Sequence, residues 1–236
     1  AYNLRSLLVR RTSTLLTVVG IGATVAVLAG ILSLQQGFAA LYEQGGRDDV
    51  VIFLRPGATS ECESYISQES GAILIKETPE IATVDGQPLA GGEIYLAVRR
   101  RKLDGGETNV PIRGVEPVSF EIAGDRLVVT EGRRLTPGTD EVIVGRALKG
   151  RIRGCQLDEI IEINTTPFRV VGIFDYDGPF SSEIWGDLRR MREALQRPGM
   201  NRVVARVRPG TDIEAMARRQ KSDERVPAKV MSEQAY

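Results

Sequence analysis

The sequence predicts an α+β protein in which one N-terminal transmembrane helix is followed by an extracytoplasmic domain. Three features of the chain lead to this prediction. The first is a long uncharged apolar run near the start, and the second is a unit of strand, Pro-Gly stop, helix and strand at each end of the remaining chain. The third is a series of short β-rich runs between those units. Two such βαβ halves form a split ferredoxin-like part, and the runs between them form an inserted β-rich subdomain.

The composition is that of an ordinary globular chain, long enough for one or two domains. Hydrophobic residues make up 42% of the 236 residues and charged residues 26%, and 31 basic residues balance 31 acidic ones. This balance gives no indication of a nucleic-acid partner. The chain contains no histidine, which excludes Ser-His-Asp and Cys-His catalysis and HExxH metal sites. An enzymatic site would have to use carboxylates, lysine or a thiol.

The apolar run predicts a transmembrane helix. No charged residue occurs from Thr12 to Tyr42, and a helix over residues 14–34 would span roughly 31 Å, which is the thickness of a bilayer core. Three arginines precede the run and no acid occurs before Glu43, so the positive-inside rule places the N-terminus in the cytoplasm. These arginines, which we expect to fix the topology, are Arg5, Arg10 and Arg11. A cleaved signal peptide is the alternative, but the run is long for one and no A-x-A site follows it.

Small residues recur on one side of this helix. Gly22, Ala26 and Gly30 are spaced four residues apart, a pattern that lets helix backbones approach closely in a bilayer. We expect this stripe to pack against partner helices, although glycine is also common in transmembrane helices in general. The segment before the helix combines leucines with arginines, which predicts a short interfacial helix on the cytoplasmic surface.

The outer region alternates strands with capped helices. In the part assigned to the ferredoxin-like fold, strands are predicted over 49–55, 71–77, 93–101, 201–208 and 226–232, with helices over 59–70 and 211–220. In the inserted part, strands are predicted over 109–116, 125–132, 140–148, 158–163 and 168–175. An amphipathic helix is expected over 184–196, and the segment from Arg146 to Arg151 is expected to begin a helix.

These elements divide the chain into five parts. They are a cytoplasmic interfacial segment (1–13), the transmembrane helix (14–34), a helical stalk (35–46), the ferredoxin-like part (47–109 and 197–236) and the inserted β-rich subdomain (110–196).

One acidic segment, from Arg169 to Met191, is the strongest candidate for a chemical site. Read as an EF-hand loop, it fails at three required positions, and a glycosidase pair would need a sugar-stacking groove that the sequence does not show. We therefore expect a structural corner in which Trp185 packs while Asp175 and Asp187 shape the turn and the start of the following helix. A second candidate, Gly145 to Gly150, has phosphate-loop spacing but lacks the lysine and the Ser/Thr. No catalytic residue, metal ligand or cofactor is predicted.

Several segments together resemble the FtsX-like, or MacB-type, ABC transporter permeases. The resemblance is carried by the first helix, by "IRGVEP", by "EGRRL…DEVIVGRALKGRI" and above all by "FRVVGIFDYDGPFSSEIWGDL". The family pattern implies a first transmembrane helix, a large extracytoplasmic domain and three further transmembrane helices, so the chain is interpreted as an N-terminal fragment. In "GCQLDEIIEI" the chain has Asp158-Glu159 where the family usually has a Gly-Asp turn.

What the resemblance implies is a non-catalytic permease subunit of the bacterial inner (plasma) membrane. It would work with a cytoplasmic ATPase and a second permease copy, in contact with membrane lipid, and couple ATP hydrolysis to movement of the outer domain. Export, lipoprotein or lipid extraction, and mechanotransmission all stay open, as does a periplasmic or outer-membrane partner. A membrane-anchored scaffold or sensor and a carboxylate-based enzyme are the alternatives.

Overall fold

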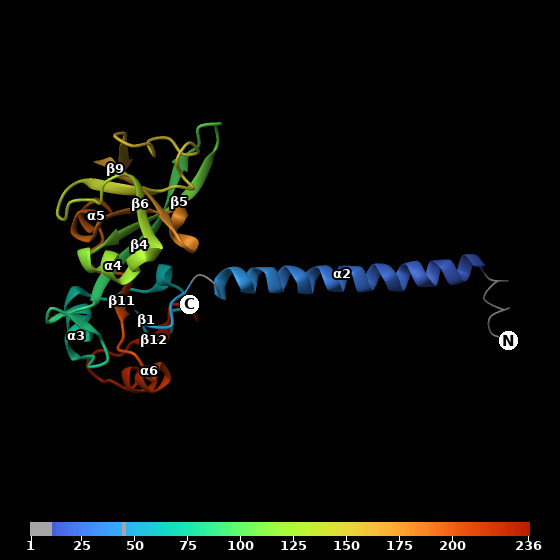
Figure 1. Cartoon of the computed structure of the whole chain (residues 1–236), viewed down its shortest axis with the longest axis horizontal. Coiled ribbons are helices and arrows are strands. Elements are labelled where there is room, and N and C mark those ends of the chain that lie inside the picture. Colours follow the sequence, from blue (N-terminus) through green and yellow to red (C-terminus); the bar gives the residue numbers. More distant parts are fainter. Residues whose placement is uncertain (1–10, 44–45) are drawn as a thin grey trace. The chain divides into compact units, whose positions relative to one another are not determined.

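The computed structural model describes residues 11–43 and 46–236, which form two units, an N-terminal helix and a sheet-rich domain. The helix, α2 (Arg11–Glu43), is continuous over 33 residues and appears in blue in Figure 1. Its stretch Leu15–Gly37 is long and apolar enough to cross a membrane, and the apolar side chains described there are exposed.

The first half of the domain is a four-stranded antiparallel sheet with two helices. Its strands are β1 (Val50–Leu54), the start of β4 (Ala90–Arg101), β11 (Arg202–Arg206) and β12 (Lys229–Ser232). They lie in the order β12-β1-β11-β4, and every neighbouring pair is antiparallel. Helix α3 (Gln68–Glu77) connects β1 to β4, and α6 (Ile213–Lys221) connects β11 to β12. This order is that of a ferredoxin-like split βαβ fold, as predicted.

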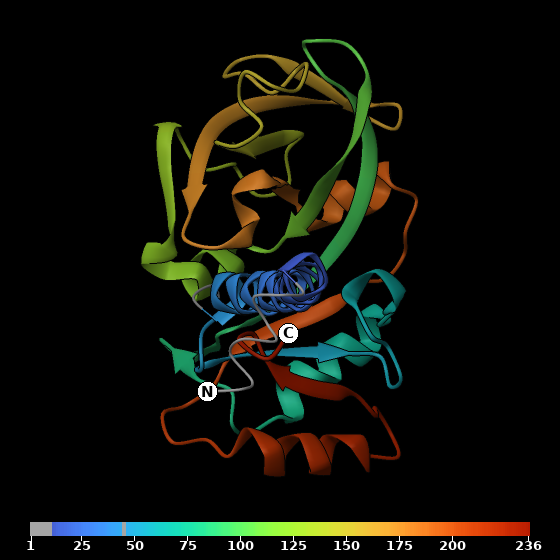
Figure 2. The ribbon, with the colours of Figure 1, turned by 90° about the vertical axis from the view of Figure 1, so that its right-hand side faces the viewer.

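The two helices begin at side-chain caps and cover one face of this sheet. The Ser67 side chain accepts a hydrogen bond from the backbone of Ser70, and Asp212 accepts one from Ala215. Leu74 of α3 and Met216 of α6 pack with Val51, Phe53 and other buried strand residues in one apolar core. Figure 2 shows α6 in red and α3 in teal in this half of the domain.

The prediction of a helix over 59–70 followed by a strand over 71–77 was wrong. Where the first helix was predicted, the chain forms a short 3-10 turn, η1 (Glu61–Glu63). Helix α3 begins only at Gln68 and includes the whole of 71–77. The reason is that Gly71 and Leu74 are the residues of this run that are fully buried. Their spacing of three places both on one face of a helix, whereas a strand would place them on opposite faces.

The second half of the domain is inserted between β4 and β11. Strand β4 joins the halves, because Ala90 to Glu93 pair with β11 and Ile94 to Arg101 pair with β5 (Glu107–Val115). The other strands are β6 (Leu127–Gly132), β7 (Glu141–Gly145), β8 (Ile160–Ile163), β9 (Thr166–Tyr176) and β10 (Ile184–Asp187). The order is β5-β10-β7-β9-β6, with β8 on β9, and the pairs β10–β5 and β7–β9 are parallel. The domain bounds given above stay a prediction.

Short helices lie beside this second sheet. They are α4 (Pro117–Ala123), the 3-10 turns η2 (Gly124–Arg126) and η3 (Pro179–Ser182), and α5 (Leu188–Ala194). A separate two-stranded ribbon, β2 (Thr83–Val84) with β3 (Gln87–Pro88), lies between α3 and β4 in the sequence. The main core of the inserted half contains Ile112, Val144, Phe168 and Ile184 together with Leu188 and Met191 of α5.

Two helix predictions in the inserted half were also wrong. Residues 184–187 form strand β10 rather than the start of a helix, and α5 begins only at Leu188. The segment from Arg146 onward forms successive turns, not a helix. Here the backbone of Ser181 lies across the end of β7 and accepts a hydrogen bond from Ala147. A side chain at Gly145 would collide with the Ser181 carbonyl. This close approach of the backbone explains why residue 145 is a glycine, and no phosphate-binding loop is needed to explain it.

Candidate functional site

The acidic corner that stood out in the sequence contains acids in three different environments. Asp175 is exposed and forms an ion pair with Arg146 at 3.1 Å. Asp187 caps α5 by accepting a hydrogen bond from the backbone of Arg190, and it also accepts one from Gly138. Glu183 is buried, as Asp187 is, but its carboxylate accepts hydrogen bonds from a buried arginine, Arg113.

Trp185, between Glu183 and Asp187, is the centre of an aromatic cluster. Its indole ring lies 5.5 Å from the ring of Phe174 and 5.9 Å from that of Phe120. The ring is almost fully buried, and its Nε1 donates a hydrogen bond of 2.8 Å to Glu183. The corner therefore joins an apolar core to a buried charge.

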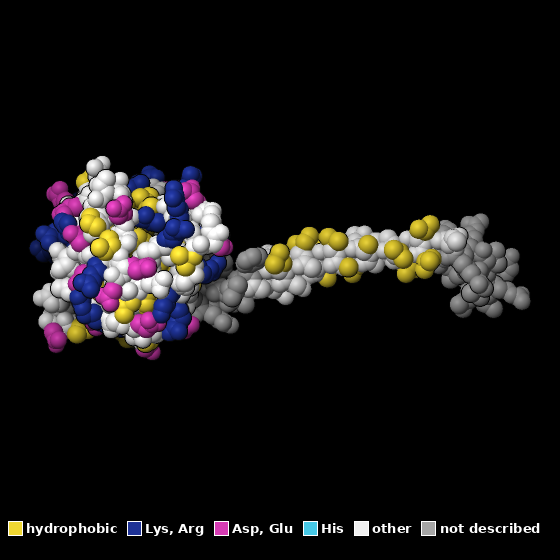
Figure 3. Space-filling model, turned by 90° about the horizontal axis from the view of Figure 1, so that it is seen from above, with side chains coloured by type: hydrophobic (Ala, Val, Ile, Leu, Met, Phe, Trp, Pro, Cys, Tyr) yellow, Lys and Arg dark blue, Asp and Glu magenta, His cyan; other side chains and the backbone are white. Residues whose placement is uncertain are grey.

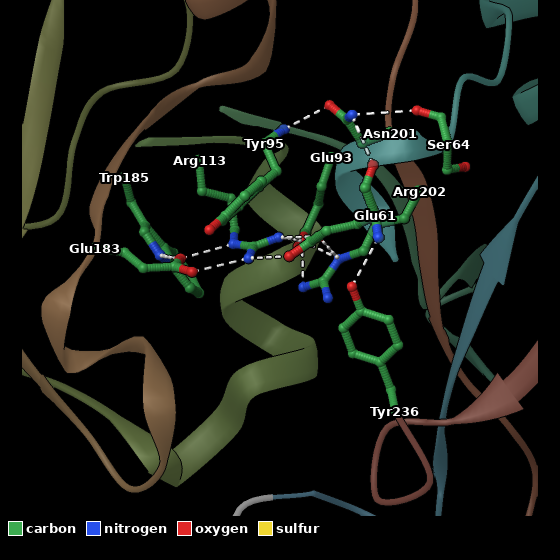
Figure 4. A network of polar contacts seen from close by, with 10 residues as sticks. All are labelled: Glu61, Ser64, Glu93, Tyr95, Arg113, Glu183, Trp185, Asn201, Arg202 and Tyr236. Atoms are coloured by element: carbon green, nitrogen blue, oxygen red, sulfur yellow. Dashed lines mark hydrogen bonds and ion pairs between the residues drawn. The ribbon is translucent and has the colours of Figure 1, made fainter. Parts of the chain in front are cut away.

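That charge belongs to a larger group, which we call the charge cluster: Glu61, Glu93, Arg113, Glu183 and Arg202. All five residues are buried, and Arg113 is 0% exposed. Glu61 comes from η1, Glu93 from β4, Arg202 from β11, and Arg113 from β5 in the inserted half. Figure 4 shows these side chains converging from both halves of the domain. Residues as far apart in sequence as Glu61 and Arg202 thus meet at one point.

Arg113 uses all five of its N–H donors within the cluster. It makes a bidentate pair with Glu183 at 2.7 and 2.9 Å and a second bidentate pair with Glu61 at 2.8 and 2.9 Å. Its fifth hydrogen bond, of 3.1 Å, goes to Glu93. The rings of Tyr95 and Phe180 each lie 5.1 Å from the guanidinium carbon. The planar fork of arginine suits this arrangement, which a lysine could not reproduce.

Arg202 connects the cluster to the ferredoxin-like sheet. Its Nε donates a hydrogen bond of 2.8 Å to Glu93 and lies 3.3 Å from a carboxylate oxygen of Glu61. Beside it, the Asn201 amide donates to the backbone carbonyls of Glu61 and Ser64 and accepts from the backbone of Tyr95. This amide fixes the η1 segment against β4.

Two arginines face three glutamates in the cluster, so most of its buried charge is paired. Burial alone would raise the pKa of Glu61, but Arg113 and Arg202 outweigh burial and lower it to about 2. Burial lowers the pKa of Arg113, yet Glu183 and Glu61 more than compensate and raise it well above its ordinary value. Both groups therefore stay charged at neutral pH, and their charges hold the cluster together.

Comparison with known proteins places the chain in a family. The sequence profile of the MacB-like periplasmic core domain matches residues 14–222. The chain belongs to this family. No curated protein sequence matches it.

Two solved structures have the same fold as this MacB-like domain. The extracellular domain of the noncanonic ABC-type transporter YknZ from Gram-positive bacteria is 15% identical, with a TM-score of 0.56. The match covers 78% of this chain and 99% of that one. The periplasmic region of MacB from Actinobacillus actinomycetemcomitans is 12% identical, with a TM-score of 0.57, and the match covers 81% of this chain and 92% of that one. The expected α+β fold and the expected family are confirmed.

Within this MacB-like chain, the predicted helix-packing residues lie on α2. A methyl group added at Gly22 or Gly30 would have no other atom within 4 Å in this single chain, and Ala26 is exposed. Their packing against another helix stays a prediction. Arg5 and Arg10 lie outside the described residues, and Arg11 is the first residue of α2, so their role in topology also stays a prediction.

The charge cluster was not predicted from the sequence, in which Glu183 is only one of several acids of the 169–191 segment. A signal was nevertheless present, because Glu93, Arg113 and Arg202 are single charged residues inside or next to apolar strands. Such residues are rarely buried unless they are paired. Nothing in the sequence, however, indicates which of the 31 acidic residues would pair with them.

The low pKa of Glu61 predicts how stability depends on pH. Its ordinary value is 4.5, so the stabilisation is fully present above about pH 4.5 and is lost as the pH falls towards 2. This shift corresponds to about 3 kcal/mol in the free energy of unfolding. Urea unfolding of the full chain in detergent at pH 6, 4 and 3, followed by Trp185 fluorescence, should show this loss. Glu61→Gln should be less stable at pH 6 but less sensitive to acid, and an equally steep acid loss in that variant would contradict the assignment.

Proposed function

We propose that this chain is part of the permease subunit of an FtsX/MacB-type ABC transporter, in which a cytoplasmic ATPase moves the extracytoplasmic domain. The family is one of ABC transporter permease subunits, which generally lack catalytic residues of their own, and it implies a cytoplasmic ATPase as partner. We further propose that the chain lies in the bacterial inner (plasma) membrane with its N-terminus in the cytoplasm. The observation that supports movement as its role is the way two chain segments are joined to the charge cluster.

The first of these segments, residues 46–49, follows the helical unit in the sequence, and the second, residues 232–236, follows β12. The backbone N–H of Arg47 donates a hydrogen bond of 3.2 Å to the Glu233 carboxylate, and the backbone of Glu233 donates to Val50. A side chain at Gly46 would collide with the backbone of Gln234. The two segments therefore lie side by side.

The second segment also contacts the inserted half and the cluster. Glu233 forms an ion pair with Arg126 of η2 at 3.3 Å, and both side chains are only 10% exposed. The Tyr236 hydroxyl accepts a hydrogen bond of 2.8 Å from the backbone of Glu61. A displacement that begins in residues 46–49 would thus reach η2 through Glu233 and the charge cluster through Tyr236.

The permease has two arrangements of its membrane helices in this proposal. ATP can shift it from one to the other only if the ATPase binds ATP with a different affinity in each. In our proposal, ATP-driven closure of the ATPases changes the packing of α2 against neighbouring helices, including that of a second permease copy. The domain then moves as a unit, because the cluster joins its halves. Export, extraction of lipoproteins or lipids, and mechanical signalling are all compatible with such a movement.

The small-residue stripe of α2 provides the test of this function. In a Cys62→Ser background, an Ala26→Cys permease, expressed at full length and reconstituted with its ATPase, should form disulfide-linked dimers. Gly22→Leu and Gly30→Leu should reduce both cross-linking and ATPase activity several-fold, because a large side chain separates the helices. Gly20→Leu, which lies off the stripe, is the matched control. Undiminished activity in the stripe variants, or a permease that functions without any ATPase, would contradict the proposal.

A further inference from the structure

The β4–β5 hairpin carries a group of arginines whose arrangement follows from the strand register. Beyond the hairpin's own pairs, Lys102 forms a bridge with Ile152. The backbone of Leu103 donates a hydrogen bond of 2.9 Å to Arg151, and that of Arg153 donates one of 3.0 Å to Arg101. The 151–153 segment therefore runs antiparallel to the end of β4 as a short third strand.

This register places five side chains on one face. Opposed residues of antiparallel strands share a face, as do residues two apart on one strand. Arg101 therefore shares a face with Arg153, and Leu103 with Arg151, while Arg99 lies two residues before Arg101. We call this set the basic face: Arg99, Arg101, Leu103, Arg151 and Arg153. All five residues are exposed, whereas Ile152 on the opposite face is buried. Figure 3 views the domain from above, the side on which the hairpin ends in Figure 1, and Lys and Arg side chains are seen there with Asp and Glu side chains between them.

The charges of the basic face are only partly compensated within the domain. Glu107, opposite Arg101 in the register, lies 3.6 Å from Arg99 and is the one carboxylate paired there. Within residues 46–236, the structure records no carboxylate within ion-pair distance of Arg101, Arg151 or Arg153. Like charges directly opposite each other destabilise a strand pair, so the Arg101–Arg153 pair costs stability.

Three surface arginines elsewhere in the domain are paired with carboxylates. Arg219 pairs with Glu80 at 2.6 Å, Arg225 with Glu77 at 2.6 Å and Arg169 with Asp158 at 2.8 Å. The basic face thus keeps an electrostatic cost that these other surface sites avoid. An external anionic group that approaches the face would remove that cost.

We propose that the basic face is the docking surface for an acidic segment of a protein partner. Guanidinium groups bind carboxylates in bidentate pairs. Neighbours on this face are about 5–7 Å apart, by strand geometry, and acidic side chains on one face of a helix have a similar spacing. Arginine is also enriched in protein interfaces.

A lipid surface fits the basic face less well. Binding to a membrane surface is strengthened by buried apolar area in addition to the attraction between basic residues and anionic lipids. The basic face offers only one apolar side chain, Leu103, which is 46% exposed, and it contains no aromatic residue. This docking surface does not depend on the transport function proposed above.

The test uses the full chain in nanodiscs of phosphatidylcholine, with fluorescein-labelled poly-L-glutamate as the probe. Wild-type chain should bind the probe, and binding should weaken as salt is added. The double variant R101E/R153E should bind about tenfold more weakly or worse, because two attractive contacts become repulsive. R189E/R197E is the matched control, since it makes the same change of net charge at two other exposed arginines. It should bind almost as well as wild type.

Melting curves of both double variants establish that each remains folded. Equal loss of binding in the two variants would overturn the proposal, because net charge and not the basic face would then explain the affinity. Absence of probe binding to wild-type chain would also overturn it. Binding of phosphatidylglycerol vesicles but not of poly-L-glutamate would assign the basic face to a lipid surface instead.

Discussion

Arg113→Met should lower the free energy of unfolding by about 3–5 kcal/mol, the usual cost of removing one partner from a buried ion pair. Methionine keeps most of the apolar stem but removes all five donors that Glu61, Glu93 and Glu183 use. Those carboxylates would remain buried with only Arg202 to balance them. Urea unfolding of the full chain in detergent, followed by fluorescence of Trp185, measures the loss directly, since Trp185 is the only tryptophan.

The matched control is a surface pair. Arg133 also makes a bidentate ion pair, with Glu141, but its side chain is 54% exposed. Arg133→Met should cost at most about 1 kcal/mol, as is usual for exposed pairs. Equal losses in the two variants would mean that the charge cluster contributes no more than an ordinary surface contact.

Trp185→Ala should destabilise the domain by a similar amount, about 3–5 kcal/mol, through loss of the aromatic packing. The substitution removes ring contacts with Phe174, Tyr176 and Phe180 and leaves Glu183 without its indole donor. Because the variant lacks the fluorophore, circular dichroism is the appropriate measurement.

Trp185→Phe separates the two contributions. It keeps part of the aromatic packing but loses the hydrogen bond to Glu183, so a smaller cost of about 1–3 kcal/mol is expected. The exposed Val128 on β6 provides the control, and Val128→Ala should have little effect. Destabilisation as small for Trp185→Ala as for Val128→Ala would contradict the structural role of the corner.

Much of the fold could be predicted because its signals are local. Asp212 and the acidic first turn mark the start of α6, and the uncharged run marks α2. The predicted strands of the inserted half were found, because each is a short apolar run between turn residues. The resemblance to the MacB-type family was confirmed by the match over residues 14–222.

The wrong predictions concern short segments in which the spacing of apolar residues does not distinguish a helix from a strand. Residues 71–77 and 184–187 are both such runs, and periodicity alone does not separate a buried helix from a buried strand over so few residues. In the structure, tertiary contacts decide each case. Gly71 packs against Met200, whereas Ile184 to Asp187 pair with β5 and β7.

The charge cluster could not be predicted because its members meet only in the folded chain. Glu61 and Arg202 are separated by most of the domain in sequence, and Arg113 lies between them in the inserted half. The ferredoxin-like order brings β4 beside β11 and thereby brings Glu93 beside Arg202, which directly face each other in the register. Burial and pairing of these charges are thus consequences of topology.

In our proposal, the charge cluster joins the two halves of the domain so that they move together. This can be tested with spin labels at Lys76→Cys in α3 and Val128→Cys in β6, in a Cys62→Ser background of the full-length permease reconstituted with its ATPase. The distance between the labels, measured by pulsed electron paramagnetic resonance, should be the same in the nucleotide-free and ATP-bound states. In Arg113→Met the distance distribution should broaden. A distance that changes on ATP binding in the chain with an intact cluster would show that the halves move separately and would contradict the account.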